Sequence, residues 1–96
     1  MIRDKRKLTI AIDFDGVITD SEECRDALHW LRSRAKLICF SCKPPELVRA
    51  LLEDLNLVTF FDGVTDRKPR ADLYVDDHGF HFDGDWAAVI LAASEL

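Results

Sequence analysis

The most informative stretch of this 96-residue chain is Leu8-Thr9-Ile10-Ala11-Ile12-Asp13-Phe14-Asp15-Gly16. Five apolar or β-branched residues run together and then give way abruptly to two carboxylates. A short apolar run without alternation is typical of a central strand of a parallel sheet, because both of its faces are buried. We therefore predict a strand over Leu8–Ile12 that carries Asp13 and Asp15 to one edge of a sheet.

A second stretch, Leu73-Tyr74-Val75-Asp76-Asp77, repeats the pattern. If the two strands are neighbours, Asp13 and Asp15 lie beside Asp76 and Asp77. Carboxylates this close repel each other strongly, so they need a proton or a cation to coexist. Mg²⁺ is a hard cation that prefers oxygen ligands, and it is the ion most often found where proteins bind or transfer phosphate. The pattern predicts a magnesium site and phosphoryl chemistry.

Helical and strand patterns alternate along the first half of the chain. Thr19, Asp20 and Ser21 are three possible N-caps of a helix. Its predicted core-facing positions are Cys24, Ala27, Leu28, Leu31 and Ala35. A strand over Leu37–Phe40 follows and ends at Ser41.

The second half continues the alternation. Pro44 and Pro45 suit the first turn of a helix that Asn56 can close. Phe60-Phe61 is predicted as a short third strand and Phe80–Phe82 as a brief edge strand. Asp83 or Asp85 is expected to cap a terminal helix that contains Trp86, Val89, Ile90 and Ala93.

Strands separated by helices predict the α/β class. We expect residues 1–96 to form a single three-layer α/β/α Rossmann-like domain, with a central parallel sheet of four to five strands and no cap domain. In such sheets ligands bind outside the carboxyl ends of the strands. The acidic pairs and Ser41 all fall at those ends.

Composition narrows the classes of function. The formal net charge is −5 with 48% hydrophobic residues, which disfavours a nucleic-acid partner because phosphate backbones recruit basic surfaces. The apolar stretch behind the basic residues Met1–Lys7 is broken at Asp13, too early for a signal peptide. With three cysteines and no long apolar run, we expect a soluble, cytoplasmic protein without a membrane partner.

Phosphoryl transfer needs a nucleophile, an acid for the leaving oxygen, donors for the phosphoryl oxygens and a metal. These groups are supplied by Asp13, Asp15, Ser41, Lys68 and Asp76. Their order resembles the four motifs of the haloacid dehalogenase superfamily of phosphohydrolases. The matching segments are Asp13-Phe14-Asp15-Gly16, Ser41 after its strand, Lys68 before Pro69, and Asp76-Asp77.

This resemblance implies a role for each matching residue. Asp13 would be the nucleophile and a metal ligand, and Asp15 the general acid/base with a backbone contact to the metal. Ser41 and Lys68 would bind the phosphoryl group. Asp76 would bind Mg²⁺ directly, and Asp77 directly or through water. The resemblance therefore implies hydrolysis of a phosphomonoester, small or exposed on a larger molecule, through an aspartyl-phosphate.

Several alternatives stay open. Ser41 could only cap the following helix, and Lys68 could be one solvated cation among Arg67 and Arg70. Cys39 and Cys42 form a C-x-x-C pair that we interpret as structural, since no second pair completes a zinc site. The segment after Asp15 is short for the superfamily, which implies a large substrate, a lid from a second subunit in a homo-oligomer, or weak activity. A receiver-like domain, phosphorylated on an aspartate of the third strand such as Asp62, and a catalytically weak structural protein remain the competing functions.

Overall fold

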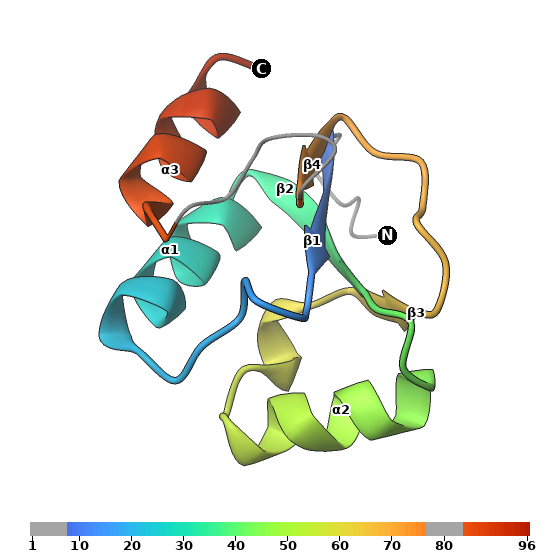
Figure 1. Cartoon of the computed structure of the whole chain (residues 1–96). Coiled ribbons are helices and arrows are strands. Elements are labelled where there is room, and N and C mark those ends of the chain that lie inside the picture. Colours follow the sequence, from blue (N-terminus) through green and yellow to red (C-terminus); the bar gives the residue numbers. More distant parts are fainter. Residues whose placement is uncertain (1–7, 77–83) are drawn as a thin grey trace, which may run out of the picture.

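A computed structural model describes residues 8–76 and 84–96 as four strands and three α-helices (Figure 1). In chain order these are β1 (Leu8–Asp13), α1 (Glu22–Arg32), β2 (Ala35–Phe40), α2 (Pro45–Asp54), the 3₁₀ helix η1 (Val58–Phe60), β3 (Gly63–Thr65), β4 (Leu73–Val75) and α3 (Trp86–Ser94). The strands form one parallel sheet in the order β3-β2-β1-β4. The predicted α/β class with a central parallel sheet is confirmed.

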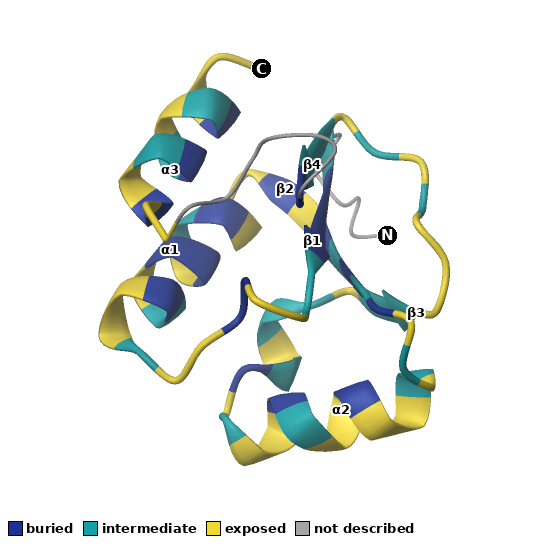
Figure 2. Ribbon diagram, in the orientation of Figure 1, coloured by how far each residue is buried: buried dark blue, intermediate teal, exposed yellow. Residues whose placement is uncertain are grey.

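The sheet buries one face much more deeply than the other. In β2, Ala35, Leu37 and Cys39 are fully buried, whereas Ile38 and Phe40 on the opposite face are half-buried. The buried face joins residues of α1, α2 and α3 in a single hydrophobic core (Figure 2). Within the described residues the three helices thus contribute to one core on one face, and the expected second helical layer is not among these residues.

Local signals explain where the helices begin. Ser21 is the N-cap of α1 and accepts a hydrogen bond from the Cys24 amide at 3.1 Å. Pro44 and Pro45 open α2, as predicted. Asp85 caps α3 by accepting from two backbone amides, whereas the alternative cap, Asp83, lies outside the described residues.

Asn56 ends α2 in the way its sequence position predicts. Its backbone has a φ of 58°, the left-handed conformation that asparagine tolerates better than most residues. The Asn56 amide donates to the Glu53 carbonyl at 3.0 Å, and the Leu57 amide donates to the Leu52 carbonyl at 2.8 Å. This pair of bonds satisfies carbonyls that the helix end would otherwise leave open.

Two predicted elements differ from the structure. Phe60-Phe61 is not a strand, because Phe60 ends η1 and the third strand is Gly63–Thr65. Ala35 does not belong to the first helix but begins β2, since α1 ends at Arg32. The predicted edge strand Phe80–Phe82 lies outside the described residues. No helix in the described ranges has the length and apolarity that crossing a lipid bilayer requires.

Candidate active site at the carboxyl edge of the sheet

Strand register brings Asp13 and Asp76 to the same edge. The pairing of β1 with β4 ends at Ile12 and Val75. The residues that follow in sequence are Asp13 and Asp76. Neighbouring strands lie about 4.8 Å apart, and successive side chains alternate between faces. Asp13 and Asp76 therefore both lie at the carboxyl edge of the sheet.

Asp15 is held by two residues that follow β2. The Ser41 hydroxyl donates to one carboxylate oxygen of Asp15 at 2.8 Å, and the Lys43 ammonium forms an ion pair with the other. The Lys43 amide also donates to the Ser41 hydroxyl at 3.1 Å. Ser41 is therefore not a cap of α2, whose N-cap is Pro44, and it lies buried beside the acidic motif.

These contacts set the charge of Asp15. The hydrogen bonds from Lys43 and Ser41 lower the pKa of its carboxyl group below the ordinary value of 3.8, against a smaller opposing effect of burial. The side chain is ionised at neutral pH in this arrangement. An acid role for Asp15 therefore requires that Lys43 or Ser41 first move away, or that a negative group arrive beside it.

Lys68 forms an ion pair with Asp76, a buried carboxylate of this edge. Its ammonium lies 2.8 Å from a carboxylate oxygen of Asp76, whose side chain is only 5% exposed. The same ammonium lies 4.6 Å from the ring centroid of Tyr74, which adds a cation–π contact. Lys68 is thus distinguished from Arg67 and Arg70 by its partner, although the partner is a carboxylate rather than a phosphate.

The described part of the chain supplies only some of the side chains that would bind a metal ion. No group of three or more His, Cys, Asp or Glu side chains converges there, and Asp77 lies outside it. Asp13 and Asp76 form a pair of hard oxygen donors at corresponding register positions. Mg²⁺ commonly binds through one or two carboxylates and keeps several water molecules, so such a pair is compatible with the ion.

A tight turn follows the acidic motif. The Asp15 amide donates to the Asp13 carboxylate at 3.3 Å, and the amides of Val17 and Ile18 both donate to the Phe14 carbonyl. Gly16 adopts a φ of +77°, which a residue with a side chain rarely tolerates. Residues 14–21 are all that joins β1 to α1, so this connection covers little of the edge.

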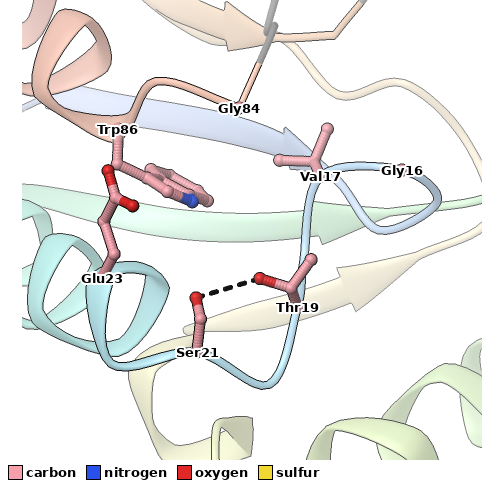
Figure 3. Close-up of a pocket in the computed structure, with 7 residues that line it drawn as sticks. All are labelled: Gly16, Val17, Thr19, Ser21, Glu23, Gly84 and Trp86. Carbon is pink, nitrogen blue, oxygen red and sulfur yellow. Dashed lines mark hydrogen bonds between the residues drawn. The ribbon is translucent and has the colours of Figure 1, made fainter.

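A pocket of about 320 Å³ opens where this turn meets the start of α3 (Figure 3). Gly16 and Val17 line one side, and Trp86 with Gly84 lines another. Figure 3 shows the Glu23 carboxylate near the Trp86 side chain and the Thr19 hydroxyl directed toward that of Ser21. Those two hydroxyl oxygens are 3.1 Å apart.

The two cysteines of the C-x-x-C pair differ in burial. Cys39 is fully buried in β2, and Cys42 is exposed. Burial, reinforced by the negative charges of Asp13 and Asp15, raises the pKa of the Cys39 thiol to about 12. This thiol stays protonated at neutral pH, in line with the structural interpretation of the C-x-x-C pair.

Lys43 is the site residue that the sequence analysis missed. The available signal was its position two residues after Ser41, which places it within reach of the same strand edge. This signal is weak, because the prolines that follow predict the start of α2 and nothing in them indicates a contact between Lys43 and Asp15.

No protein-family model, curated protein or solved structure matches the chain.

Proposed function

We propose that this chain is a Mg²⁺-dependent phosphomonoester hydrolase that acts through an aspartyl-phosphate on Asp13. The observation that carries the proposal is the gathering of Asp13, Asp15, Ser41, Lys68 and Asp76 at the carboxyl ends of β1, β2 and β4. Carboxylates, a hydroxyl and an ammonium at one sheet edge are the groups that phosphoryl transfer requires.

The proposed reaction has two steps. Lys43 first moves away from Asp15, which then takes up a proton. A carboxylate oxygen of Asp13 attacks phosphorus, the bond to the leaving oxygen breaks, and the protonated Asp15 donates its proton to that oxygen. Asp15 then takes a proton from water as the water oxygen attacks phosphorus, which releases phosphate and restores Asp13. Ser41 and Lys68 would hold the phosphoryl oxygens during both steps.

Asp13 and Asp76 would hold Mg²⁺, with Asp77 as a further ligand, and the bound ion would offset repulsion between the Asp13 carboxylate and the phosphate dianion. Lys68 would leave Asp76 for the phosphoryl group when the ion is bound. The exchange preserves a positive charge beside the buried Asp76 carboxylate, and leaving that carboxylate unpaired would be costly.

The decisive experiment measures phosphate release from p-nitrophenyl phosphate with and without Mg²⁺. We expect sustained release with Mg²⁺ by the wild-type chain and none by Asp13→Asn, whose circular dichroism spectrum should match the wild type. Full turnover by Asp13→Asn would contradict the nucleophile assignment. Equal rates of phosphate release with and without Mg²⁺ would contradict the metal requirement.

A catalytically weak protein is the second candidate, and the ion pair between Lys43 and Asp15 favours it. A general acid held as a carboxylate protonates a leaving alkoxide poorly. This candidate predicts neither turnover nor lasting phosphorylation in the same assay. Labelling that stops at one equivalent of phosphate would instead support the receiver-like alternative.

The receiver-like alternative loses its proposed acceptor in this structure. Asp62 lies before β3, not at its carboxyl end, and its carboxylate accepts a hydrogen bond from the Leu37 amide at 3.0 Å. Asp66, which follows β3 and is exposed, takes the position that the alternative requires. Single-equivalent labelling should therefore be mapped by peptide mass spectrometry to Asp66 or to Asp13.

A further inference from the structure

Two adjoining pockets continue from the acidic motif along the junction of α1 and α3. The first, described above, begins at Gly16, the residue after Asp15. The second has a volume of about 540 Å³ and is lined by residues of both helices. They share Glu23 and Trp86, so they form one depression, here called the α1–α3 groove.

The groove has a definite chemical character. Its acidic lining residues are Glu22, Glu23 and Asp26, and its aromatic ones are Trp30 and Trp86. Among the lining residues in the described part of the chain, none is a lysine or an arginine. Carboxylates beside indole rings attract an organic cation through charge and through the ring faces.

Arg34 makes a cation–π contact of this kind with Trp30. The Arg34 guanidinium lies 4.4 Å from the ring centroid of Trp30, at the far end of the groove from Gly16. Trp86, at the near end, is almost fully buried, and the Glu23 side chain is exposed above it. The near end therefore offers the exposed Glu23 carboxylate, beside a Trp86 side chain that is almost fully covered, to a group entering from the Asp15 side.

We propose that the α1–α3 groove binds the leaving group of the substrate, and that this leaving group is an alcohol carrying an ammonium group. This inference rests on the proposed function, since it places the phosphoryl group at Asp13. A substrate with a second anionic group would meet the Glu23 carboxylate and be repelled. The substrate class is thus the phosphate monoester of a small amino alcohol.

The test compares three phosphate esters of similar size in the full-length chain with Mg²⁺. These are phosphoethanolamine, which carries an ammonium, neutral ethyl phosphate, and anionic phosphoglycolate. We expect the highest kcat/KM for phosphoethanolamine and the lowest for phosphoglycolate. In Glu23→Gln, the ratio of kcat/KM for phosphoethanolamine to that for ethyl phosphate should fall about fivefold, the effect of one partly exposed charge pair.

Glu46→Gln is the matched control, because Glu46 is an exposed glutamate in the first turn of α2, as Glu23 is in α1. That variant should keep the wild-type ratio. Equal kcat/KM for the three esters, or a ratio unchanged by Glu23→Gln, would overturn the inference while turnover of p-nitrophenyl phosphate still supported the hydrolase.

A binding measurement separates the two proposals when turnover is absent. Phosphoethanolamine is titrated into Asp13→Asn while the indole ¹⁵N–¹H signals of Trp30 and Trp86 are followed by NMR. We expect the Trp86 signal to shift with phosphoethanolamine and not with ethyl phosphate. Equal shifts with both esters, or none with either, would overturn the groove assignment independently of catalysis.

Discussion

At the scale of single residues, the contact between Lys43 and Asp15 links the candidate site to stability. Asp15 has a lowered pKa in the folded chain, so its interactions stabilise the fold above the ordinary carboxyl pKa of 3.8 and are lost as the pH falls through the folded value. Both side chains are more than 40% exposed, which limits the effect through solvent screening.

We expect Lys43→Met to lower the free energy of unfolding at pH 7 by less than about 1 kcal/mol. The difference from wild type should be smaller at acidic pH, because it is lost as the pH falls through the lowered pKa of Asp15. Urea unfolding at the two pH values measures it. An equal loss at both pH values would mean that Lys43 acts through its ammonium, which lies 5.9 Å from the Phe14 ring centroid, on that ring rather than on Asp15.

The proposed role of Asp15 can be tested by comparing substrates that differ in their leaving groups. Asp15→Asn removes the proposed proton donor, so alkyl phosphates, whose leaving alkoxides need a proton, should lose far more activity than p-nitrophenyl phosphate. We expect a further loss of kcat of about a hundredfold for ethyl phosphate, the lower end of general acid contributions. Equal losses on the two esters would exclude the acid role.

The reactivity of the three thiols toward an alkylating reagent tests whether the cysteines of β2 and α1 are buried. Cys42 is exposed, whereas Cys24 and Cys39 are fully buried and burial raises the pKa of both thiols. N-ethylmaleimide at pH 7.5 should add once to the native chain and three times in denaturant, as read by intact mass. Rapid addition at Cys39 in the native chain would show that β2 opens far more readily than its burial implies.

At the scale of elements, the N-cap of α3 offers a test with a conservative control. Asp85 accepts from the Ala87 amide at 3.0 Å and from the Ala88 amide at 3.3 Å. Asp85→Ala should cost about 1 kcal/mol of stability, whereas Asp85→Asn should retain most of it because asparagine caps nearly as well. Urea unfolding distinguishes the two. Equal destabilisation by both variants would mean that the negative charge matters more than the cap.

Local signals predicted most elements but not the third strand. Ser21, Pro45, Asn56 and Asp85 mark helix ends through their own backbone preferences, so a single sequence reveals them. The paired phenylalanines suggested a strand, yet the pairing that matters is made by Gly63–Thr65 against β2. Three residues beginning with glycine give almost no pattern, so only the tertiary partner defines this strand.

The candidate site was predictable where it follows strand ends and unpredictable where it depends on side-chain partners. The pairing of β1 with β4 ends at Ile12 and Val75, so Asp13 and Asp76 follow it at one sheet edge, as the apolar runs that end in carboxylates predict. The attachment of Lys43 to Asp15 depends on how the segment after β2 turns, which no short-range pattern encodes. Likewise, which face of the sheet receives the helices is a property of the complete packing.

At the scale of the whole molecule, one face of the sheet carries the core. Leu28 is fully buried in the cluster that unites the three helices, whereas Ile38 is half-buried on the opposite face over Gly63. Leu28→Ala should cost about 2–5 kcal/mol, and Ile38→Ala clearly less. Denaturant unfolding of both variants checks this. Equal costs would show that the Ile38 face is packed as tightly as the other.

In the sheet formed by residues 8–76, the two outermost strands, β3 and β4, are each three residues long. A foreign strand could form ladder bonds with either for only about 10 Å, too short a template for stable extension. In this part of the chain the edge strands therefore limit foreign pairing by their short length, and neither contains a proline. Concentrated solutions should accordingly resist conversion into fibrils that bind thioflavin T.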